Sequence, residues 1–356
     1  MRQTVKGETR ITMSNGSWNV AVVGALGMVG TEMIRTLERR NFPVGELRPL
    51  DLPENEGRGI DFRGEAVRLR GATEENFKGI DIALFSAGGA ASLDLAPKAV
   101  KQGAVVVDNS SAWRMDPSCP LVVPEVNAGD LDLHRGIIAN PNCSTIQMVV
   151  VLKPIHDRAK IKRVVVATYQ ATTGAGQKGS LALERESMQF CKVGTAVDPE
   201  GFQYQIAFNV IPHIDVFQQG GYTKEEYKMV NETKKIMGDD SIRVTATCVR
   251  VPVFYGHSEA VNVETETKIS PEQARSILEN SPGVVVLDDP ENLKYPMPIM
   301  SDQQDATFVG RIREDFSIEN GLNLWIVSNN IRKGAALNAV QIAEQLVLRD
   351  LLNKQD

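Results

Sequence analysis

The sequence predicts a two-domain α/β protein. The first domain should have a parallel sheet with helices around it, and the second should be α+β with a mostly antiparallel sheet. The chain has 356 residues, which is enough for two domains. Short apolar runs alternate with helical patterns in its first part. From about residue 161, long β-branched runs follow one another with few helices between them, which is typical of an antiparallel sheet.

The composition is that of a soluble globular protein, with 42% hydrophobic and 24% charged residues. The net charge of −6 and the scattered basic residues disfavour nucleic acid or a membrane as partner, and no apolar run could span a bilayer. The four cysteines form no CxxC pair, so we predict no disulfide, no metal site and a cytoplasmic location. Residues 1–17 are polar, and we expect a disordered extension rather than a secretory signal, with Met13 as a candidate natural start.

The first strand is predicted at Val20–Val23 and is followed at once by the glycine-rich turn GALGMVG at Gly24–Gly30. Helical periodicity then continues through Met33, Ile34 and Leu37. This order is typical of a Rossmann-type dinucleotide-binding domain, because the glycines let the backbone turn tightly beside a pyrophosphate at the helix N-terminus. The spacing is GxxGxxG rather than the commoner GxGxxG, and any tight strand–helix turn could show it. The interpretation therefore depends on the alternating β/α segment that follows.

Polar loops follow the later strands of this segment. Loops at the carboxyl ends of parallel strands are where an open α/β sheet binds its ligand. Each loop alone could be a simple turn, but four in register predict a cofactor cleft. The expected elements are strands at Leu47–Leu50 (ending in Asp51), Ala66–Leu69, Ile80–Phe85 and Ala104–Val107, a polar loop at Pro53–Gly59, the loops Ser86–Gly89 and Asp108–Ser111, and a helix at Ala91–Lys101.

A cysteine follows the last apolar run of this domain, in the turn Asn140–Thr145. A helical pattern, Ile146–Ile155, begins directly afterwards, which places Cys143 at a helix N-terminus. There the unpaired N–H groups and the helix dipole favour a thiolate, as a nucleophile requires. The alternative is a small residue packed at a strand–helix joint. Upstream, Arg114 lies in a loop beside the expected cleft and is a candidate anion ligand, although most loop arginines only meet solvent.

The second domain is expected to combine long strands with two amphipathic helices. Its last predicted helix lies far beyond the domain, so we expect that helix to pack on the first domain. The elements are strands at Lys162–Gln170, Ile242–Val251, Glu259–Thr267 and Gly321–Val327, helices at Lys178–Cys191, Lys224–Met237 and Lys333–Leu352, and a proline-rich loop at Pro290–Asp302.

Five further side chains have the chemistry of an active site. Arg250 and His257 flank a stretch that a proline and a glycine interrupt, so both could face one cleft. A thiol nucleophile needs a proton acceptor and an orienting group, and His257 and Gln170 are of the right types. Glu225 and Lys228 are three residues apart on one helical face. The alternatives are a turn histidine bonded to backbone and a solvated Glu–Lys pair.

Together these motifs resemble those of the aspartate-β-semialdehyde dehydrogenase family. The resemblance covers nearly the whole chain from Trp18 to Leu352, and the coincidence of so many motifs indicates common descent. The motifs are GAxGxVG at Gly24–Gly30, SAGG at Ser86–Gly89, DNSSAWR at Asp108–Arg114, PLVVPEVN at Pro120–Asn127, NPNCST at Asn140–Thr145, RVPVFYGHS at Arg250–Ser258 and NNIRKGAALN at Asn329–Asn338.

The resemblance implies a role for each site residue. Cys143 would form the acyl-enzyme, Gln170 would orient the intermediate and His257 would be the acid/base. Arg250 would hold the substrate carboxylate and Glu225 its amine. The reaction would be the reductive dephosphorylation of aspartyl 4-phosphate to aspartate 4-semialdehyde with NADPH, in the biosynthesis of lysine, threonine and methionine.

The resemblance also implies the remaining ligands and the organisation of the chain. Arg114, Asn142 and Lys228 would bind the phosphoryl group. A homodimer would form through the sheet of the second domain. The dinucleotide-binding domain would comprise residues 18–142 and 329–356, and the catalytic and dimerisation domain residues 143–328. The cofactor-binding residues would be Gly24, Leu26, Gly27, Met28, Val29, Glu54, Asn55, Gly88, Thr173, Gly174 and Asn330.

One departure from the family pattern concerns the cofactor. Relatives carry a basic-plus-hydroxyl pair after the second strand for the 2′-phosphate of NADP, whereas this chain has Glu54-Asn55, with Asp51 just before. An acidic residue at the end of the second strand is the usual partner of a free ribose 2′-OH, which would suit NAD. We therefore predict a weakened preference for NADP and measurable NAD-linked activity.

Two other functions are alternatives. N-acetyl-γ-glutamyl-phosphate reductases share the thiol-and-nicotinamide chemistry, but the Glu225–Lys228 pair and the RVPVFYGHS stretch favour the aspartyl enzyme. A non-catalytic dinucleotide-sensing protein would be expected to lack Cys143 or His257, and both are present.

Overall fold

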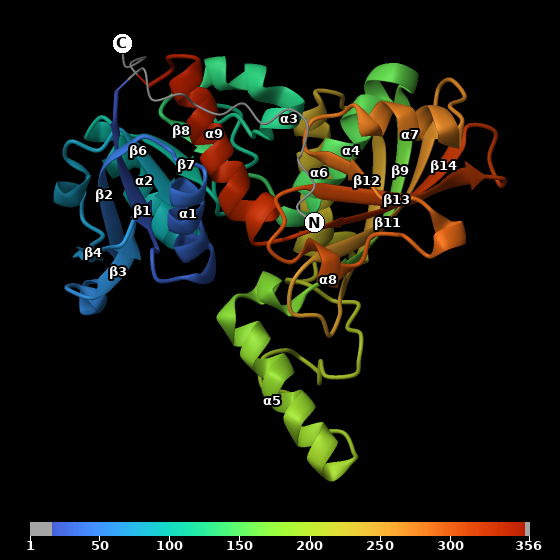
Figure 1. Ribbon diagram of the computed structural model, residues 1–356, viewed down its shortest axis with the longest axis horizontal. Coiled ribbons are helices and arrows are strands. Elements are labelled where there is room, and N and C mark those ends of the chain that lie inside the picture. The colour runs from blue at the N-terminus through green and yellow to red at the C-terminus, as the bar shows by residue number, and fades with distance from the viewer. Residues whose placement is uncertain (1–15, 353–356) are drawn as a thin grey trace. The chain divides into compact units, whose positions relative to one another are not determined.

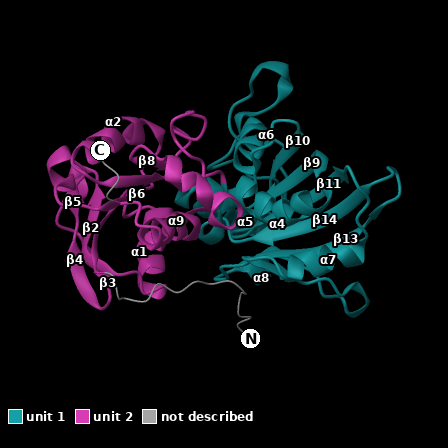
Figure 2. Ribbon diagram, turned by 90° about the horizontal axis from the view of Figure 1, so that it is seen from above, with its two compact units in different colours: residues 1–8, 143–334 teal, residues 9–142, 335–356 magenta. Residues whose placement is uncertain are grey.

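The computed structural model describes residues 16–352, which form two compact units (Figure 2). Unit 2 contains residues 16–142 and 335–352, and unit 1 contains residues 143–334. Most of the predicted N-terminal extension, Met13 included, lies outside the described residues. Residues 329–334, which the sequence analysis assigned to the first domain, belong to unit 1. The reason is local: the Asn330 side chain donates to Thr173 Oγ1 (3.0 Å) and accepts from Gly256 N (3.0 Å).

Unit 2 is built on a six-stranded parallel sheet with the order β5-β2-β1-β6-β7-β8. The central strand β1 pairs with β2 on one side and β6 on the other, so the strand order reverses there, as in a Rossmann-type sheet. The hairpin β3–β4 is separate, and β3 occupies part of a segment for which we predicted no strand. The strands are β1 Trp18–Val23, β2 Val44–Asp51, β3 Gly59–Phe62, β4 Glu65–Arg68, β5 Arg70–Gly71, β6 Ile82–Phe85, β7 Val105–Asp108 and β8 Ile137–Ala139.

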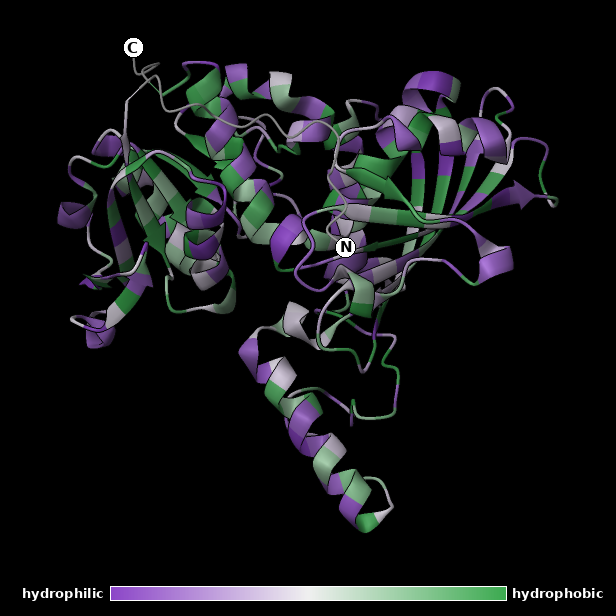
Figure 3. Ribbon diagram, in the orientation of Figure 1, coloured by the Kyte–Doolittle hydropathy of each residue, from purple (hydrophilic) through white to green (hydrophobic). Residues whose placement is uncertain are grey.

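Helices cover both faces of this sheet, because alternate strand residues point to opposite sides. Val20 and Val22 pack in a core with the helices α1 and α9, whereas Ala21 and Val23 pack in a second core with α2. Figure 3 shows the hydrophobic residues concentrated on these strands. The C-terminal helix thus packs on the first domain, as predicted, although its α-helical part ends at Leu348. The helices are α1 Met28–Arg39, α2 Gly89–Lys101, α3 Pro124–Asn127 and α9 Leu337–Leu348, which follows a π-helical turn, Arg332–Ala336.

Unit 1 contains a second six-stranded sheet, with the order β10-β9-β11-β14-β13-β12. The three central pairings are antiparallel, and the two edge pairings, β10 with β9 and β12 with β13, are parallel. The sheet is therefore mixed, with the antiparallel core that the sequence predicts. Its strands are β9 Ile161–Gln170, β10 Arg243–Arg250, β11 His257–Thr265, β12 Val284–Val286, β13 Thr307–Asp315 and β14 Gly321–Ser328.

One face of this sheet is covered by helices. Within residues 16–352 no long helix covers the other face, where Trp325 Nε1 donates to the carbonyl of Pro296 (2.9 Å). The helices α4, α6 and α7 pack against the strands. On the opposite face, alternate residues of β9 and β11, such as Ala167 and Ala260, are only half-buried and Tyr169 is exposed. The helix α5 extends away from the sheet (Figure 1). The helices of unit 1 are α4 Cys143–Ala159, α5 Gln177–Val193, α6 Lys224–Met237, α7 Pro271–Glu279 and α8 Pro298–Ser301.

The region between β11 and β14 holds several elements that we did not predict. The helix α7 begins with a capping box, in which Ser270 and Gln273 satisfy each other's backbone N–H groups. The strand β13 contains four charged residues within Arg311–Asp315, which hide its alternation. The segment Pro290–Asp302, predicted as a loop, contains the single-turn helix α8.

Candidate active site

The register of the unit 1 sheet places three predicted site residues side by side. Arg250 ends β10 opposite Gln170, the last residue of β9. His257 begins β11, and the next residue, Ser258, lies opposite Tyr169, the neighbour of Gln170. The three side chains therefore form one row across three strands. All are buried, with exposed fractions of 6% for Arg250, 1% for Gln170 and 0% for His257.

Cys143 is the first residue of α4 and is partly exposed. The backbone of Gly334 passes directly against it, since a Cβ at position 334 would lie 2.8 Å from Cys143 Cβ. Burial lowers the pKa of Arg250, whereas the negative charges of Glu225 and Cys143 act in the opposite direction. The thiol therefore lies within electrostatic reach of the guanidinium. A cation nearby and a helix N-terminus both favour the thiolate form.

Gly174 leaves room for the row of site residues. A Cβ at this position would lie 2.6 Å from Arg250 Nη1 and 3.3 Å from His257 Nε2, closer than side chains can pack. Arg250 Nη1 donates to the carbonyl of Ala171 (2.7 Å), and the guanidinium lies 5.9 Å from the ring centre of Phe202. The remaining N–H groups of Arg250 stay available for a bidentate contact with a carboxylate.

The hydrogen bonding of His257 defines where its proton lies. The backbone N–H of Ala171 donates to His257 Nδ1 (3.0 Å), so the neutral ring carries its proton on Nε2. Burial, together with the positive charge of Arg250, lowers the pKa of His257 to about 3. Nε2 is buried and has no hydrogen-bond partner among residues 16–352. At neutral pH the ring is thus an uncharged donor beside Gly174.

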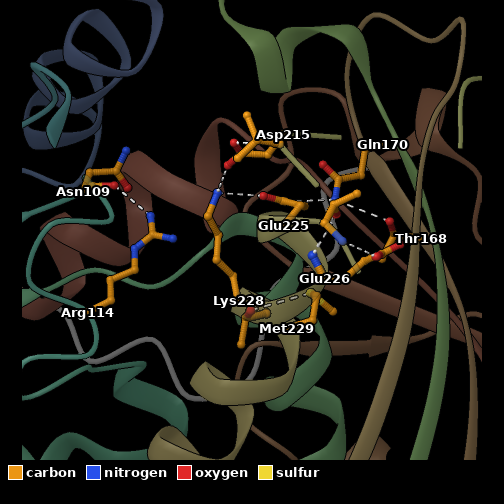
Figure 4. A network of polar contacts seen from close by, with 12 residues as sticks. Asn109, Arg114, Thr168, Gln170, Asp215, Glu225, Glu226, Lys228 and Met229 are labelled. Atoms are coloured by element: carbon orange, nitrogen blue, oxygen red, sulfur yellow. Dashed lines mark hydrogen bonds and ion pairs between the residues drawn. The ribbon is translucent and has the colours of Figure 1, made fainter. Parts of the chain in front are cut away.

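The predicted pair of Glu225 and Lys228 is part of a larger network (Figure 4). Glu225 Oε1 accepts from Gln170 Nε2 (3.1 Å), and Glu225 Oε2 pairs with Lys228 Nζ (2.9 Å). Lys228 also pairs with Asp215 (3.0 Å). Glu225 is only 5% exposed, so the solvated-pair alternative is wrong. A capping box between Thr223 and Glu226 fixes the start of α6, which carries both residues.

The glycine turn of unit 2 has the geometry that a nucleotide pyrophosphate requires. A Cβ at Gly30 would lie 2.1 Å from the carbonyl oxygen of Gly24, so α1 packs against the turn as only glycine allows. Gly24 has φ +78° and lies against Ser86, and Gly27 is the N-cap of α1 without a side-chain cap. The first turn of α1 therefore presents open N–H groups. Gly88, with φ +79°, opens α2 in the same way.

The acidic segment after β2 is held together by its own hydrogen bonds. Asp51 accepts from the backbone N–H of Leu26 (3.1 Å), which links it to the glycine turn, and from Asn55 Nδ2 (3.0 Å). Arg58 Nη1 donates to Asn55 Oδ1 (3.0 Å), so this arginine folds back over the segment. Glu54 is exposed. One cation and two carboxylates therefore gather where a ribose 2′ group is expected.

The two units hold different parts of the predicted site. Unit 1 brings together Cys143, Gln170, Glu225, Lys228, Arg250 and His257, with Thr173, Gly174 and Asn330 nearby. In unit 2, Arg114 is 7% exposed and donates to the carbonyl of Asn109 (2.9 Å), and Asn142 is also buried. The phosphate-binding role of Arg114 and Asn142 stays a prediction, as does the cofactor role of Thr173, Gly174 and Asn330.

Sequence reasoning missed two residues of this site. Gly334 lies in the quoted stretch NNIRKGAALN, where a glycine at a helix start could have suggested a close approach. Asp215 gave no signal, because it lies 13 residues before Lys228, in the irregular segment that precedes α6. Within residues 16–352, no group of three His, Cys, Asp or Glu side chains could hold a metal ion. No helix in this part of the chain is both long and apolar enough to cross a membrane.

Fold and site together define a class: a nicotinamide-dinucleotide-linked oxidoreductase with a cysteine at a helix N-terminus. Two family descriptions match the chain, "Semialdehyde dehydrogenase, NAD binding domain" at residues 19–134 and "Semialdehyde dehydrogenase, dimerisation domain" at residues 152–333. A nicotinamide dinucleotide is therefore the cofactor. The chain belongs to the aspartate-semialdehyde dehydrogenase family.

The individual relatives match this chain over almost their full length. Aspartate-semialdehyde dehydrogenase of Aquifex aeolicus is 58% identical, with 94% of this chain and 99% of the relative covered. The enzyme of Bacillus subtilis is 49% identical, with 92% and 97% covered. The crystal structure of aspartate semialdehyde dehydrogenase II from Vibrio cholerae has a TM-score of 0.90 at 48% identity, covering 94% and 99%, and a second structure of that enzyme is a complex with ASA.

Proposed function

We propose that this chain interconverts aspartyl 4-phosphate and aspartate 4-semialdehyde through a thioester on Cys143, with NADP as its main cofactor and NAD also accepted. The observation that carries this proposal is the position of Cys143 at the start of α4, in the unit that aligns Arg250, Gln170 and His257 in one buried row. The names of the relatives and the complex with ASA support the substrate.

The thiol divides the reaction into two steps. In the biosynthetic direction the Cys143 thiolate attacks the acyl carbon, the C–S bond forms, the C–O bond to phosphate breaks and phosphate leaves. The hydride that reduces the thioester carbon is the chemistry that a bound nicotinamide supplies. The tetrahedral oxyanion then collapses, so that the C=O bond re-forms, the C–S bond breaks and the thiolate is restored. Atoms and charge balance when one proton is consumed, which the phosphate takes up as it leaves.

His257 stabilises the oxyanion in this scheme. Its proton lies on Nε2, because Nδ1 accepts from Ala171. An uncharged ring that donates a hydrogen bond in a dry site is an effective electrophile. The acid half of the predicted acid/base role would require a ring protonated on both nitrogens, which a pKa of about 3 disfavours at neutral pH. The base half would require Nε2 without a proton, which the Ala171 N–H disfavours.

The buried carboxylate Glu225 selects the substrate. It lies between Gln170 and Lys228, within reach of a substrate ammonium bound near the row. Arg250 would take the α-carboxylate of the same substrate. An N-acetylated substrate lacks the ammonium and would leave this carboxylate without its partner, so the N-acetyl-γ-glutamyl-phosphate reductase alternative is disfavoured. Turnover of N-acetylglutamate semialdehyde at a rate comparable to aspartate semialdehyde would reverse this assignment.

The face of the unit 1 sheet opposite α4, α6 and α7 is the proposed homodimer surface. Tyr169 and Trp325 lie on it with ring centres 5.5 Å apart, and Ala167 and Ala260 lie on the same face. A sheet face with such residues needs a cover, and the match to a dimerisation domain supports a second copy of the chain. Ala260→Arg should produce a monomer in sedimentation, and an unchanged dimer would exclude this face.

The cytoplasm is the proposed location, because four widely spaced cysteines without a CxxC pair are typical of a chain in a reducing compartment.

A phosphate-dependent assay with aspartate semialdehyde, run separately with NADP and NAD, tests the proposed reaction. Cys143→Ala should lower kcat on the order of 10⁴-fold or more while leaving cofactor binding intact. Cys191→Ala, which alters an exposed cysteine on α5, is the matched control and should behave like the wild type. Near-normal turnover by Cys143→Ala would remove the central claim.

A further inference from the structure

A glutamate without a hydrogen-bond partner lies directly behind the catalytic row. Glu259 is two residues beyond His257 on β11, so its side chain is on the same face of the sheet. It is completely buried, and neither carboxyl oxygen has a hydrogen-bond partner among residues 16–352. A buried charge without a partner is strongly unfavourable, so the group is expected to be neutral.

The surroundings of Glu259 also favour the neutral form. It lies opposite Thr168 on β9 and Ile326 on β14, neither of which carries a charge. The other titratable groups on this side of the sheet are His257 on the same strand, Cys248 on β10, and Glu225 and Glu226 on α6. The pKa of Cys248 is raised mainly by burial and then by the charge of Glu225. Burial raises the pKa of Glu259 well above its ordinary value. Only the Gln147 side chain opposes this, because it lies near enough for a weak hydrogen bond with the carboxyl group, although the pair lacks good hydrogen-bond geometry.

Gln147 of α4 connects this carboxyl group to the catalytic histidine. Its Nε2 donates to the backbone carbonyl of His257 (3.4 Å). Its Oε1 is buried and has no partner within the described residues. A protonated carboxyl group has an O–H donor, and an amide oxygen is an acceptor. The O–H of a neutral Glu259 is therefore a suitable donor for the Oε1 atom of Gln147.

We propose that Glu259 is a neutral carboxylic acid that positions His257 by holding Gln147, which in turn fixes the His257 backbone. The inference rests on the proposed function only for the role of His257. Glu259 is a positioning residue, because it contacts neither substrate nor cofactor. Its effect is to keep the imidazole where Nδ1 accepts from Ala171 and Nε2–H faces the reacting oxygen.

The charge state is tested by stability against pH in Glu259→Gln, which keeps the shape and the donor but cannot ionise. A carboxyl group whose pKa is raised in the folded protein destabilises it as pH rises above the unfolded pKa. The Tm of Glu259→Gln should therefore equal that of the wild type near pH 4.5 and exceed it by a growing margin up to pH 8. A margin that is absent, or that shrinks as pH rises, would mean an ionised Glu259 and would overturn the proposal.

The positioning role is tested by kinetics. Glu259→Gln should retain kcat within about threefold, whereas Glu259→Leu, which cannot hold Gln147, should lower kcat roughly ten- to a hundredfold with both KM values nearly unchanged. A role in folding alone would move stability and activity together, but here Glu259→Leu should be at least as stable as the wild type at pH 8. Wild-type kcat in Glu259→Leu, or an equal loss in both variants, would overturn the proposal.

Gln147→Leu provides a second route if Glu259→Leu does not fold. It should lower kcat to the same extent, and adding Glu259→Gln should cause no further loss, because both residues act through one contact. Additive losses would contradict the shared contact. Failure of the proposed function would instead appear as a wild type without phosphate-dependent activity, so the two failures are distinguishable.

Discussion

Lowering the pH should destabilise the folded protein through His257. The unfolded ring takes up a proton below its ordinary pKa of 6.5, whereas burial and Arg250 hold the pKa of the folded ring at about 3. Between these values the unfolded state binds more protons through this residue, so the contribution of His257 to stability rises with pH in this window and is constant above it. Over the 1.5 pH units from pH 6.5 to pH 5, the free energy of unfolding should fall by about 1.4 kcal/mol per pH unit, or roughly 2 kcal/mol in all.

The assay is thermal unfolding of the wild type and His257→Asn between pH 5 and pH 8. His257→Asn loses the buried ring and will have its own stability at pH 8, so the informative quantity is the change in the Tm difference with pH. That difference should shift in favour of the variant as pH falls. His213→Asn removes a partly exposed histidine stacked on Phe217 and is the matched control. A wild type and a His257→Asn variant with parallel curves would refute the buried neutral ring.

The same protonation state has a kinetic consequence. The pH dependence of kcat/KM reports ionisations of the free enzyme. Because the pKa of His257 is about 3, no histidine ionisation of this residue should appear near pH 6.5. A wild-type inflection at pH 6–7 that disappears in His257→Asn would show that the ring titrates in the free enzyme.

Three further substitutions test the binding groups. Arg250→Lys keeps the charge but loses the bidentate grip, so the KM for semialdehyde should rise about ten- to a hundredfold with little change in the KM for phosphate; an equal rise in both would contradict the carboxylate role. Gly174→Ala should lower kcat/KM by about a hundredfold, because its Cβ would lie 2.6 Å from the guanidinium, whereas Gly129→Ala, with open space around it, should be silent. Arg58→Glu should lower kcat/KM with NADP more than about tenfold while sparing NAD, with the exposed Arg68→Glu as control; equal losses with both cofactors would exclude a contact with the 2′-phosphate.

The elements with a clear hydrophobic period were predictable from the sequence. The helix α6 occupies the predicted range Lys224–Met237, because its caps and its apolar positions agree. The neighbouring strands β12 and β13 were harder to predict. The charged residues within Arg311–Asp315 hide the alternation of β13, and β12 has only three residues. Their places depend on pairing with distant strands, which local patterns do not contain.

The site was predictable in its residue types but not in its hydrogen bonds. The sequence identified His257 and Gln170 as partners of a thiol, but it could not show that a backbone amide occupies Nδ1. It treated Glu225 and Lys228 as an isolated pair and could not place Asp215 beside them. It also gave no reason to single out Glu259, since a glutamate in an alternating strand normally faces water. Register and burial, which tertiary structure alone defines, changed each of these interpretations.

The two buried titratable groups of β11 should limit the pH range of stability from opposite sides. Neutral His257 destabilises the fold as pH falls below 6.5, and neutral Glu259 destabilises it as pH rises above about 4.5, so both act between these values and each acts alone outside them. A strand that served only the fold would have apolar residues at both positions. His257 and Glu259 occupy alternate positions of one strand, because alternate side chains of a strand point to the same face of the sheet. The loss of stability from burying these groups is therefore confined to β11. In the proposed reaction this strand presents Nε2–H of His257 to the reacting oxygen, where a fixed, uncharged hydrogen-bond donor is needed.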